Sequence, residues 1–159
     1  MFLFSCAMSK LTYGCEVAMP PKVLNKLMDQ ILRVIWSKDQ KHRCAPLLFI
    51  STLKAHKLHP SFTVVWTVLR NIRKFLIKHP VERTQFKIHW ETCVGNKPGP
   101  IHTFQECFKT LGWTMHNDWL IQREHDVEID MLNCTHSLWS HECRRGIKIA
   151  IVRDLVSKG

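Results

Sequence analysis

The sequence has no long run of hydrophobic residues and contains little glycine or proline. Its longest apolar stretches, such as residues 47–50 and 62–66, are far shorter than the roughly 20 residues of a membrane-spanning helix. Six glycines and seven prolines among 159 residues exclude collagen-like and low-complexity proteins. Hydrophobic residues make up 45% of the chain, enough to bury a core in one domain or two small lobes. Residues 1–8 are apolar but lack the basic leader of a secretory signal, so we interpret them as buried structure.

Sequence signatures of enzymes and of metal sites are also missing. The seven cysteines include no CxxC pair, and their odd number does not suggest a closed disulfide framework or a zinc ribbon. No GxSxG, Walker, HExxH or dinucleotide-binding glycine motif occurs. We therefore expect a protein that is not an enzyme on its own, with no cofactor and no metal. Reduced thiols indicate an intracellular location, in the nucleus or the cytoplasm.

Two groups of residues carry side chains that could bind a metal ion. The first group comprises Cys134, His136, His141 and Cys143. On a helix, steps of about 100° per residue turn these side chains to different faces, which favours packing or surface positions over zinc binding. The second group is a row of alternating carboxylates: Glu124, Asp126, Glu128 and Asp130. Because the other oxygen ligands of a calcium loop are missing, we interpret this row as the exposed face of a strand.

Positive charge exceeds negative charge, and the excess lies in one part of the chain. The sequence has 23 lysines and arginines against 13 aspartates and glutamates, a formal net charge of +10. Residues 21–57 carry eight basic and two acidic side chains, residues 58–92 carry six and two, and residues 93–159 carry eight of each. A basic part joined to a neutral part is typical of a polyanion-binding lobe on a neutral support. The alternative is a charged surface that only keeps the protein soluble.

Helical spacing of apolar residues dominates the first 94 positions. Residues 24–35, which follow two prolines, carry apolar side chains at intervals of three and four. Residues 45–54 repeat this spacing, and a long helix is predicted over residues 60–78. Residues 82–94 form a weaker helical candidate. The basic side chains fall on the faces of these helices that are opposite to the apolar residues.

These basic faces carry the residues that we expect to contact nucleic-acid phosphates. They are Lys22, Lys26, Arg33, Arg43, Arg70, Arg73, Lys74 and Lys78. Arg70, Lys74 and Lys78 form an i, i+4 ladder, and a bound anion would relieve the repulsion between them. We expect the basic ridges of two helices to lie side by side and hold one sugar-phosphate chain. Trp66 lies one turn before Arg70, but packing in the core is favoured over stacking on a base.

Residues 95–100, with the sequence GNKPGP, form the clearest break in the chain. They predict a linker between a basic helical lobe over residues 1–94 and a small α+β lobe over residues 101–159. The predicted fold class is therefore mainly α, with a minor β part (α+β).

Alternating and helical patterns follow one another in the second lobe. A short helix is predicted over residues 101–111, ending at Gly112. A turn at residues 116–118 and an alternating segment after it predict a small antiparallel β meander. The last predicted helix continues nearly to the C-terminus, with Thr135 or Ser137 as its cap.

Four short motifs are scattered over most of the chain: SKLTYGCE at residues 9–16, RVIWS at 33–37, TLGWT at 110–114 and WSHECRR at 139–145. The first two resemble the segment just after the polymerase palm of non-LTR retrotransposon reverse transcriptases. In that family an lxYGxE segment precedes a helix ending in RxiwG, and Ser37 here stands in place of the glycine. The last two resemble motifs from the C-terminal extension of the same polymerases.

The resemblance implies a thumb-like helical lobe that grips template and primer during target-primed reverse transcription. The family's catalytic turn, an aromatic residue followed by Ala-Asp-Asp, is missing, and none of the six aspartates is adjacent to another. Two-metal nucleotidyl transfer requires such clustered carboxylates. We therefore expect a truncated remnant of a reverse transcriptase, without palm or endonuclease, that binds the backbone of RNA, DNA or an RNA/DNA hybrid nonspecifically.

Two other functions stay open at this point. A helical protein-interaction module with no nucleic-acid role would use its basic faces for solubility or to meet an acidic protein. Alternatively, a separate polymerase palm supplies catalysis in trans and is a partner of this chain. No membrane partner is expected.

Overall fold

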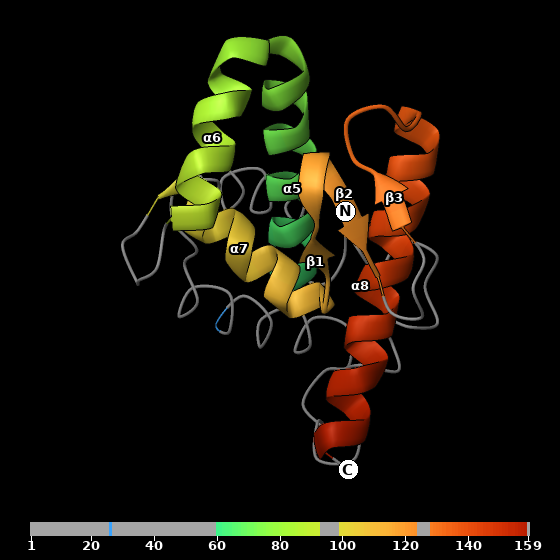
Figure 1. Cartoon of the computed structure of the whole chain (residues 1–159). Coiled ribbons are helices and arrows are strands. Elements are labelled where there is room, and N and C mark those ends of the chain that lie inside the picture. The colour runs from blue at the N-terminus through green and yellow to red at the C-terminus, as the bar shows by residue number, and fades with distance from the viewer. Residues whose placement is uncertain (1–25, 27–59, 93–98, 124–127, 159) are drawn as a thin grey trace.

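The computed structural model of the protein describes residue 26 and residues 60–92, 99–123 and 128–158. From residue 60 onward, the described residues form four α-helices and a three-stranded antiparallel sheet (Figure 1). The mainly helical fold with a minor β part is confirmed. The helices predicted over residues 24–35 and 45–54 lie outside the described residues.

Helices α5 (Pro60–Lys78) and α6 (Pro80–Thr92) form a hairpin that turns at His79 (Figure 1). The helix predicted over residues 60–78 is confirmed, and the weaker candidate at 82–94 corresponds to α6. Pro80 opens α6 because a proline in the first turn has no N–H that needs a helical partner.

The side chain of Arg83 repairs the backbone defect that Pro80 creates. In an unbroken helix the N–H of residue 80 would donate to the carbonyl of Leu76, four residues earlier. Proline has no such N–H. Arg83 donates to that carbonyl instead, from Nε at 3.0 Å and from Nη2 at 2.9 Å. The hairpin therefore turns without leaving a buried carbonyl unpaired.

Helix α7 (Pro100–Leu111) ends where the sequence predicts, at Gly112. Gly112 has φ of 71° and ψ of 29°, a left-handed conformation that glycine adopts without a steric penalty. The N–H of Trp113 then donates to the carbonyl of Phe108 at 2.9 Å and closes the helix end. The chain leaves α7 in the direction of the sheet.

The sheet is a meander of three short strands: β1 (Thr114–Met115), β2 (Leu120–Gln122) and β3 (Glu128–Asp130). Their order is β1-β2-β3 and both pairings are antiparallel, as predicted. A 3-10 turn, η1 (Asn117–Trp119), joins β1 to β2 at the predicted turn.

Helix α8 (His136–Lys158) begins after Thr135, whose Oγ1 accepts the N–H of Leu138 at 3.2 Å. Of the two predicted caps, Thr135 is therefore the one used. Figure 1 shows α8 along one side of the molecule, with its C-terminal turns extending beyond the other elements. In the part of the chain that the structure describes, no helix is both long enough and apolar enough to cross a membrane.

A chain of aromatic rings connects three helices and the start of the sheet. Ring centroids are separated by 5.8 Å between Phe86 and Phe104, by 4.8 Å between Phe104 and Phe108, by 6.0 Å between Phe108 and Trp113, and by 6.1 Å between Trp113 and Trp139. Aromatic pairs at such distances add about 0.5–1.5 kcal/mol each to the free energy gained by burial. The core is therefore continuous from the α5–α6 hairpin to α8, across the predicted break at residues 95–100.

Gly146 sets how closely α8 approaches this chain of rings. A Cβ atom at position 146 would lie 2.8 Å from Cζ2 of Trp113, and that ring is itself buried between Phe108 and Trp139. Glycine in the middle of a helix costs about 1 kcal/mol relative to alanine, so the close contact is what requires it here.

We expect Gly146→Ala to lower the free energy of unfolding by about 1–2 kcal/mol, because the overpacking outweighs the better helix propensity of alanine. Urea denaturation followed by tryptophan fluorescence measures the change. Arg145→Ala, at the neighbouring exposed position, is the control and should change stability by less than about 0.5 kcal/mol. A Gly146→Ala variant more stable than the wild type would contradict the packing described.

Candidate functional site

The predicted phosphate-binding residues fall into three groups in the structure. Three lie outside the described residues: Lys22, Arg33 and Arg43. Lys26 is described and exposed. Four lie on α5: Arg70, Arg73, Lys74 and Lys78. The predicted side-by-side arrangement of two basic helices involves residues that the structure does not describe. Among the described residues, the candidate phosphate contacts lie mainly on α5.

Arg73 is buried and does not belong to an exposed basic ridge. Only 6% of its surface is accessible. Its Nε donates to the carbonyl of Met131 at 2.7 Å, and its Nη2 donates to the carbonyl of Cys134 at 2.6 Å. Its guanidinium carbon lies 5.7 Å from the centroid of the Trp139 ring, a cation–π distance. Contrary to the sequence prediction, this side chain fastens α5 to the loop before α8 and is not available to a phosphate.

The loop that receives Arg73 is held in shape by Asp130. Its carboxylate accepts the N–H groups of Leu132 and Asn133, both at 3.1 Å, and the side-chain amide of Asn133 at 2.8 Å. Burial raises the pKa of Asp130, but these hydrogen bonds outweigh burial and bring the pKa below its usual value. The carboxylate is therefore ionised at neutral pH and stabilises the loop conformation that accepts Arg73.

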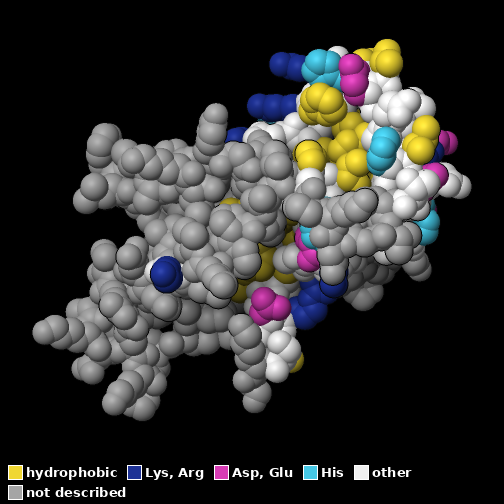
Figure 2. Space-filling view, turned by 90° about the vertical axis from the view of Figure 1, so that its left-hand side faces the viewer, with side chains coloured by type: hydrophobic (Ala, Val, Ile, Leu, Met, Phe, Trp, Pro, Cys, Tyr) yellow, Lys and Arg dark blue, Asp and Glu magenta, His cyan; other side chains and the backbone are white. Residues whose placement is uncertain are grey.

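The other three basic residues of α5, Arg70, Lys74 and Lys78, form what we call the α5 basic stripe. Lys74 and Lys78 are exposed and Arg70 is half-buried. Among the described residues none of the three forms an ion pair, and the buried Nε of Arg70 has no hydrogen-bond partner. Figure 2 shows lysine and arginine side chains projecting at the margin of the described surface, beside hydrophobic and histidine side chains.

A second basic surface, the α8 basic face, was missed in the sequence. It consists of His141, Arg144, Arg145 and Lys148, spaced so that they share one side of the helix. The first three are exposed and Lys148 is half-buried. Counting charge by segment concealed this face, because residues 93–159 carry equal numbers of acidic and basic side chains. Helical periodicity applied to the charged residues would have found it.

The α8 basic face owes its charge to the inward position of Glu142. This is the one acidic residue between positions 136 and 153, and its side chain is only 9% accessible. It forms an ion pair with Arg123, whose side chain is 11% accessible. Removing either partner would leave the other charge buried and unpaired, which is costly. The pair therefore keeps the negative charge of this segment away from the outer face of α8.

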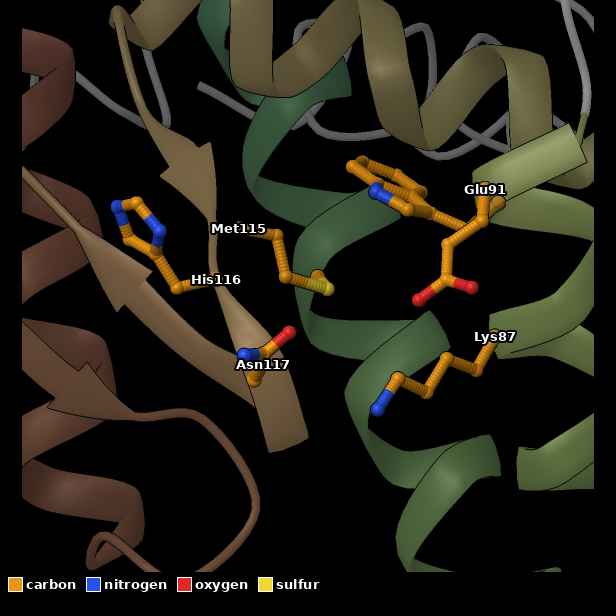
Figure 3. A pocket seen from close by; sticks show the side chains of 6 residues that line it. Lys87, Glu91, Met115, His116 and Asn117 are labelled. Atoms are coloured by element: carbon orange, nitrogen blue, oxygen red, sulfur yellow. The ribbon is translucent and has the colours of Figure 1, made fainter.

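A pocket of about 320 Å³ lies between α6 and the start of the sheet (Figure 3). It is lined by Lys87, Trp90, Glu91, Met115, His116 and Asn117. Lys87 forms a 3.1 Å ion pair with the exposed Asp118, and the ring of His116 points away from α6 and pairs with Gln122. With Lys87 and Glu91 both on its wall, the pocket is mixed in charge and does not resemble a polyanion site.

The two groups of potential metal ligands do not converge in the described residues. No three His, Cys, Asp or Glu side chains there come close enough to hold a metal ion. Cys143 is buried, whereas His136 and His141 are exposed. Burial raises the pKa of Cys143 well above its usual value and also raises that of Cys134, where the neighbouring Arg73 partly offsets the effect. Both thiols are therefore protonated at neutral pH.

The structure also shows where Trp66 and part of the predicted carboxylate row lie. Trp66 is 7% accessible and belongs to the hydrophobic core, as the sequence analysis favoured. In the predicted carboxylate row, Glu124 and Asp126 lie outside the described residues. Glu128 and Asp130 lie on β3, where Glu128 is exposed, as the interpretation of an exposed strand face expects. Asp130 is half-buried there and also accepts N–H groups of the turn that follows.

The described residues thus include two basic surfaces and a pocket of mixed charge. Comparisons with protein-family models, with curated proteins and with solved structures find no match for this chain. The features that bear on function are therefore the basic surfaces and the sequence motifs.

Matched substitutions at adjacent positions separate the structural arginine from the exposed stripe. Arg73→Met should lower the free energy of unfolding by about 2–4 kcal/mol, because it leaves two buried carbonyls without charged donors. Lys74→Met, the same kind of change at an exposed position, should alter it by less than about 0.5 kcal/mol. Urea denaturation measures both. Small and equal changes would contradict the role assigned to Arg73.

Proposed function

We propose that this protein binds the sugar-phosphate backbone of RNA or DNA without reading base sequence. The observation that carries the proposal is the α5 basic stripe, three cations on one face of a helix with no acidic partner among the described residues. Lysine and arginine contacts to phosphates position a nucleic acid but do not select its sequence. A bound backbone would also relieve the repulsion within the stripe.

The composition and the rigidity of α5 favour backbone binding over simple solubility. The helix has four basic residues and no acidic residue among its 19 positions. A surface that only needs to be soluble usually intersperses charges of both signs. The opposite side of α5 is deeply buried through residues such as Val65, Leu69 and Leu76. Its cations are therefore presented from a helix fixed in the core.

The α8 basic face offers a second set of possible phosphate contacts. Its guanidinium groups, from Arg144 and Arg145, have the fork of donors that suits phosphate oxygens. With both surfaces engaged, about five phosphates would be neutralised, which gives a slope of log affinity against log salt near −4 to −5 on duplex DNA.

The family resemblance supports the same function. A thumb-like region of a non-LTR retrotransposon reverse transcriptase grips template and primer without carrying the catalytic carboxylates. Because no two aspartates are adjacent in this sequence, we propose a binding role and no polymerase activity for this chain alone. A separate palm remains a proposed partner.

A protein-interaction module is the second candidate, favoured by apolar side chains exposed on the α5–α6 hairpin. Val81 is 80% accessible and Ile88 is 48% accessible. Both lie on α6, whose described residues include none that is fully buried. If a variant without the charges of the α5 basic stripe retains RNA as the wild type does, the stripe does not bind nucleic acid. That result would favour this candidate.

Salt-dependent binding tests the proposed function. Lys74→Gln with Lys78→Gln should reduce the magnitude of the salt slope by about 2 and weaken binding at low salt, because two phosphate contacts are lost. Filter binding or fluorescence anisotropy with duplex DNA, at salt concentrations from about 50 to about 200 mM, measures the affinity and its salt slope.

The control is Lys87→Gln with Lys109→Gln, which removes the same net charge at two positions outside the stripe. The control variant should keep the slope of the wild type. Equal losses in both double variants would show that binding follows net charge alone. An absence of binding at low salt would refute the proposed function itself.

A further inference from the structure

A row of rings runs beside the lysines of the α5 basic stripe. Phe75 and His79 are one helical turn apart, with ring centroids separated by 4.7 Å and planes inclined by 32°. Both side chains are exposed, Phe75 to 44%. Each ring follows a lysine directly in the sequence, Lys74 before Phe75 and Lys78 before His79.

The two rows are parallel because their members share the same spacing of four residues. At a rise of about 1.5 Å per residue, each row repeats every 6 Å or so along the helix axis. Adjacent residues differ by about 100° around a helix, so the ring row lies beside the cation row and not on the far side of α5. Figure 2 shows hydrophobic, histidine, basic and acidic side chains at one margin of the described surface.

Phe75 is exposed although two of its apolar neighbours on α5 are buried. Ile72 and Leu76 are 5% and 0% accessible and lie in the core, whereas Ile77, at 41%, is exposed like Phe75. Phe75 occupies the exposed side, where its ring contacts His79. An isolated exposed apolar residue needs no explanation. An exposed ring pair beside two lysines that form no ion pair within the described part of the chain fits a specific ligand.

We propose that Lys74, Phe75, Lys78 and His79 form a stacking platform that binds single-stranded RNA or DNA in preference to duplex. This inference rests on the proposed function and specifies its substrate. The lysines hold phosphates, while the rings stack on bases that a duplex keeps paired and stacked inside. A duplex would therefore engage the cation row alone.

The short length of the platform limits what it recognises. Two rings one turn apart provide stacking surface for one or two bases, and every base has a face on which a ring can stack. The platform therefore discriminates between strand states and not between sequences. Trp66, the aromatic residue one turn before Arg70, is buried in the core and is not available to stack on a base.

A comparison of Phe75→Leu with Phe75→Tyr tests the platform. Leucine keeps an apolar side chain but removes the ring, whereas tyrosine keeps the ring. Fluorescence anisotropy would measure affinity for a mixed-sequence single-stranded oligonucleotide and for a hairpin duplex with the same number of phosphates, at one salt concentration. Urea denaturation of each variant verifies folding, which the exposed position of Phe75 favours.

The wild type should bind the single strand more tightly than the duplex. Phe75→Leu should weaken single-strand binding about tenfold, since stacking contributes about 1–3 kcal/mol per base, and should change duplex binding less than about twofold. Phe75→Tyr should retain the affinity of the wild type for the single strand.

Three other outcomes would contradict the stacking platform. The first is equal affinity of the wild type for single strand and duplex. Backbone binding would still stand in that case if the loss of the Lys74 and Lys78 charges weakened the binding of both ligands. Equal effects of Phe75→Leu on the two ligands also overturn the platform. Failure of the wild type to bind either ligand at low salt overturns the platform together with the proposed function.

Discussion

The orientation of α5 depends on one buried cation. Arg73 reaches out of the helix into a loop whose carbonyls, from Met131 and Cys134, accept its donors, and its guanidinium packs over the ring of Trp139. A buried guanidinium is stable only where its N–H groups find acceptors, so this position allows little rotation of the helix. With Arg73 fixed inward, the next residue in the chain, Lys74, is turned outward, and Lys78 follows one turn later.

The protein thus separates its charges by burial. Arg73 is satisfied by carbonyls, and Arg123 and Glu142 satisfy each other. The lysines and arginines of the α5 basic stripe and of the α8 basic face form no ion pair among the described residues. Because exposed charges without partners interact with mobile anions at little desolvation cost, these surfaces suit a polyanion better than the interior pairs do. The interior charges hold the helices, and the exterior charges are left for a ligand.

Much of this fold was predictable because its local signals are strong. Prolines at positions 60, 80 and 100 mark helix starts, and Gly112 marks a helix end, since each residue type has a fixed backbone preference. The meander followed from alternation of apolar and polar residues around a turn. Thr135 as a cap was one of two choices that local chemistry allowed.

The candidate site was less predictable, because it depends on which elements pack together. Helical spacing places Arg73 beside Arg70 and Lys74, and nothing local shows that a loop about 60 residues later in the sequence covers it. The α8 basic face was hidden because residues 93–159 carry eight acidic and eight basic side chains, yet six of the acidic ones lie outside α8 and Glu142 is buried. The four-residue spacing of Phe75 and His79 is visible in the sequence, but nothing local shows that the Phe75 ring stays on the exposed side of α5.

The most direct test of the account is lysine footprinting by mass spectrometry. The protein would be labelled with an amine-reactive reagent, with and without a saturating single-stranded oligonucleotide. The account predicts that Lys74 and Lys78 are protected by the oligonucleotide, whereas Lys87, paired with Asp118 beside the pocket, and Lys109 on α7 are labelled equally in both states. Protection of Lys87 or Lys109 with unchanged labelling of Lys74 and Lys78 would contradict it.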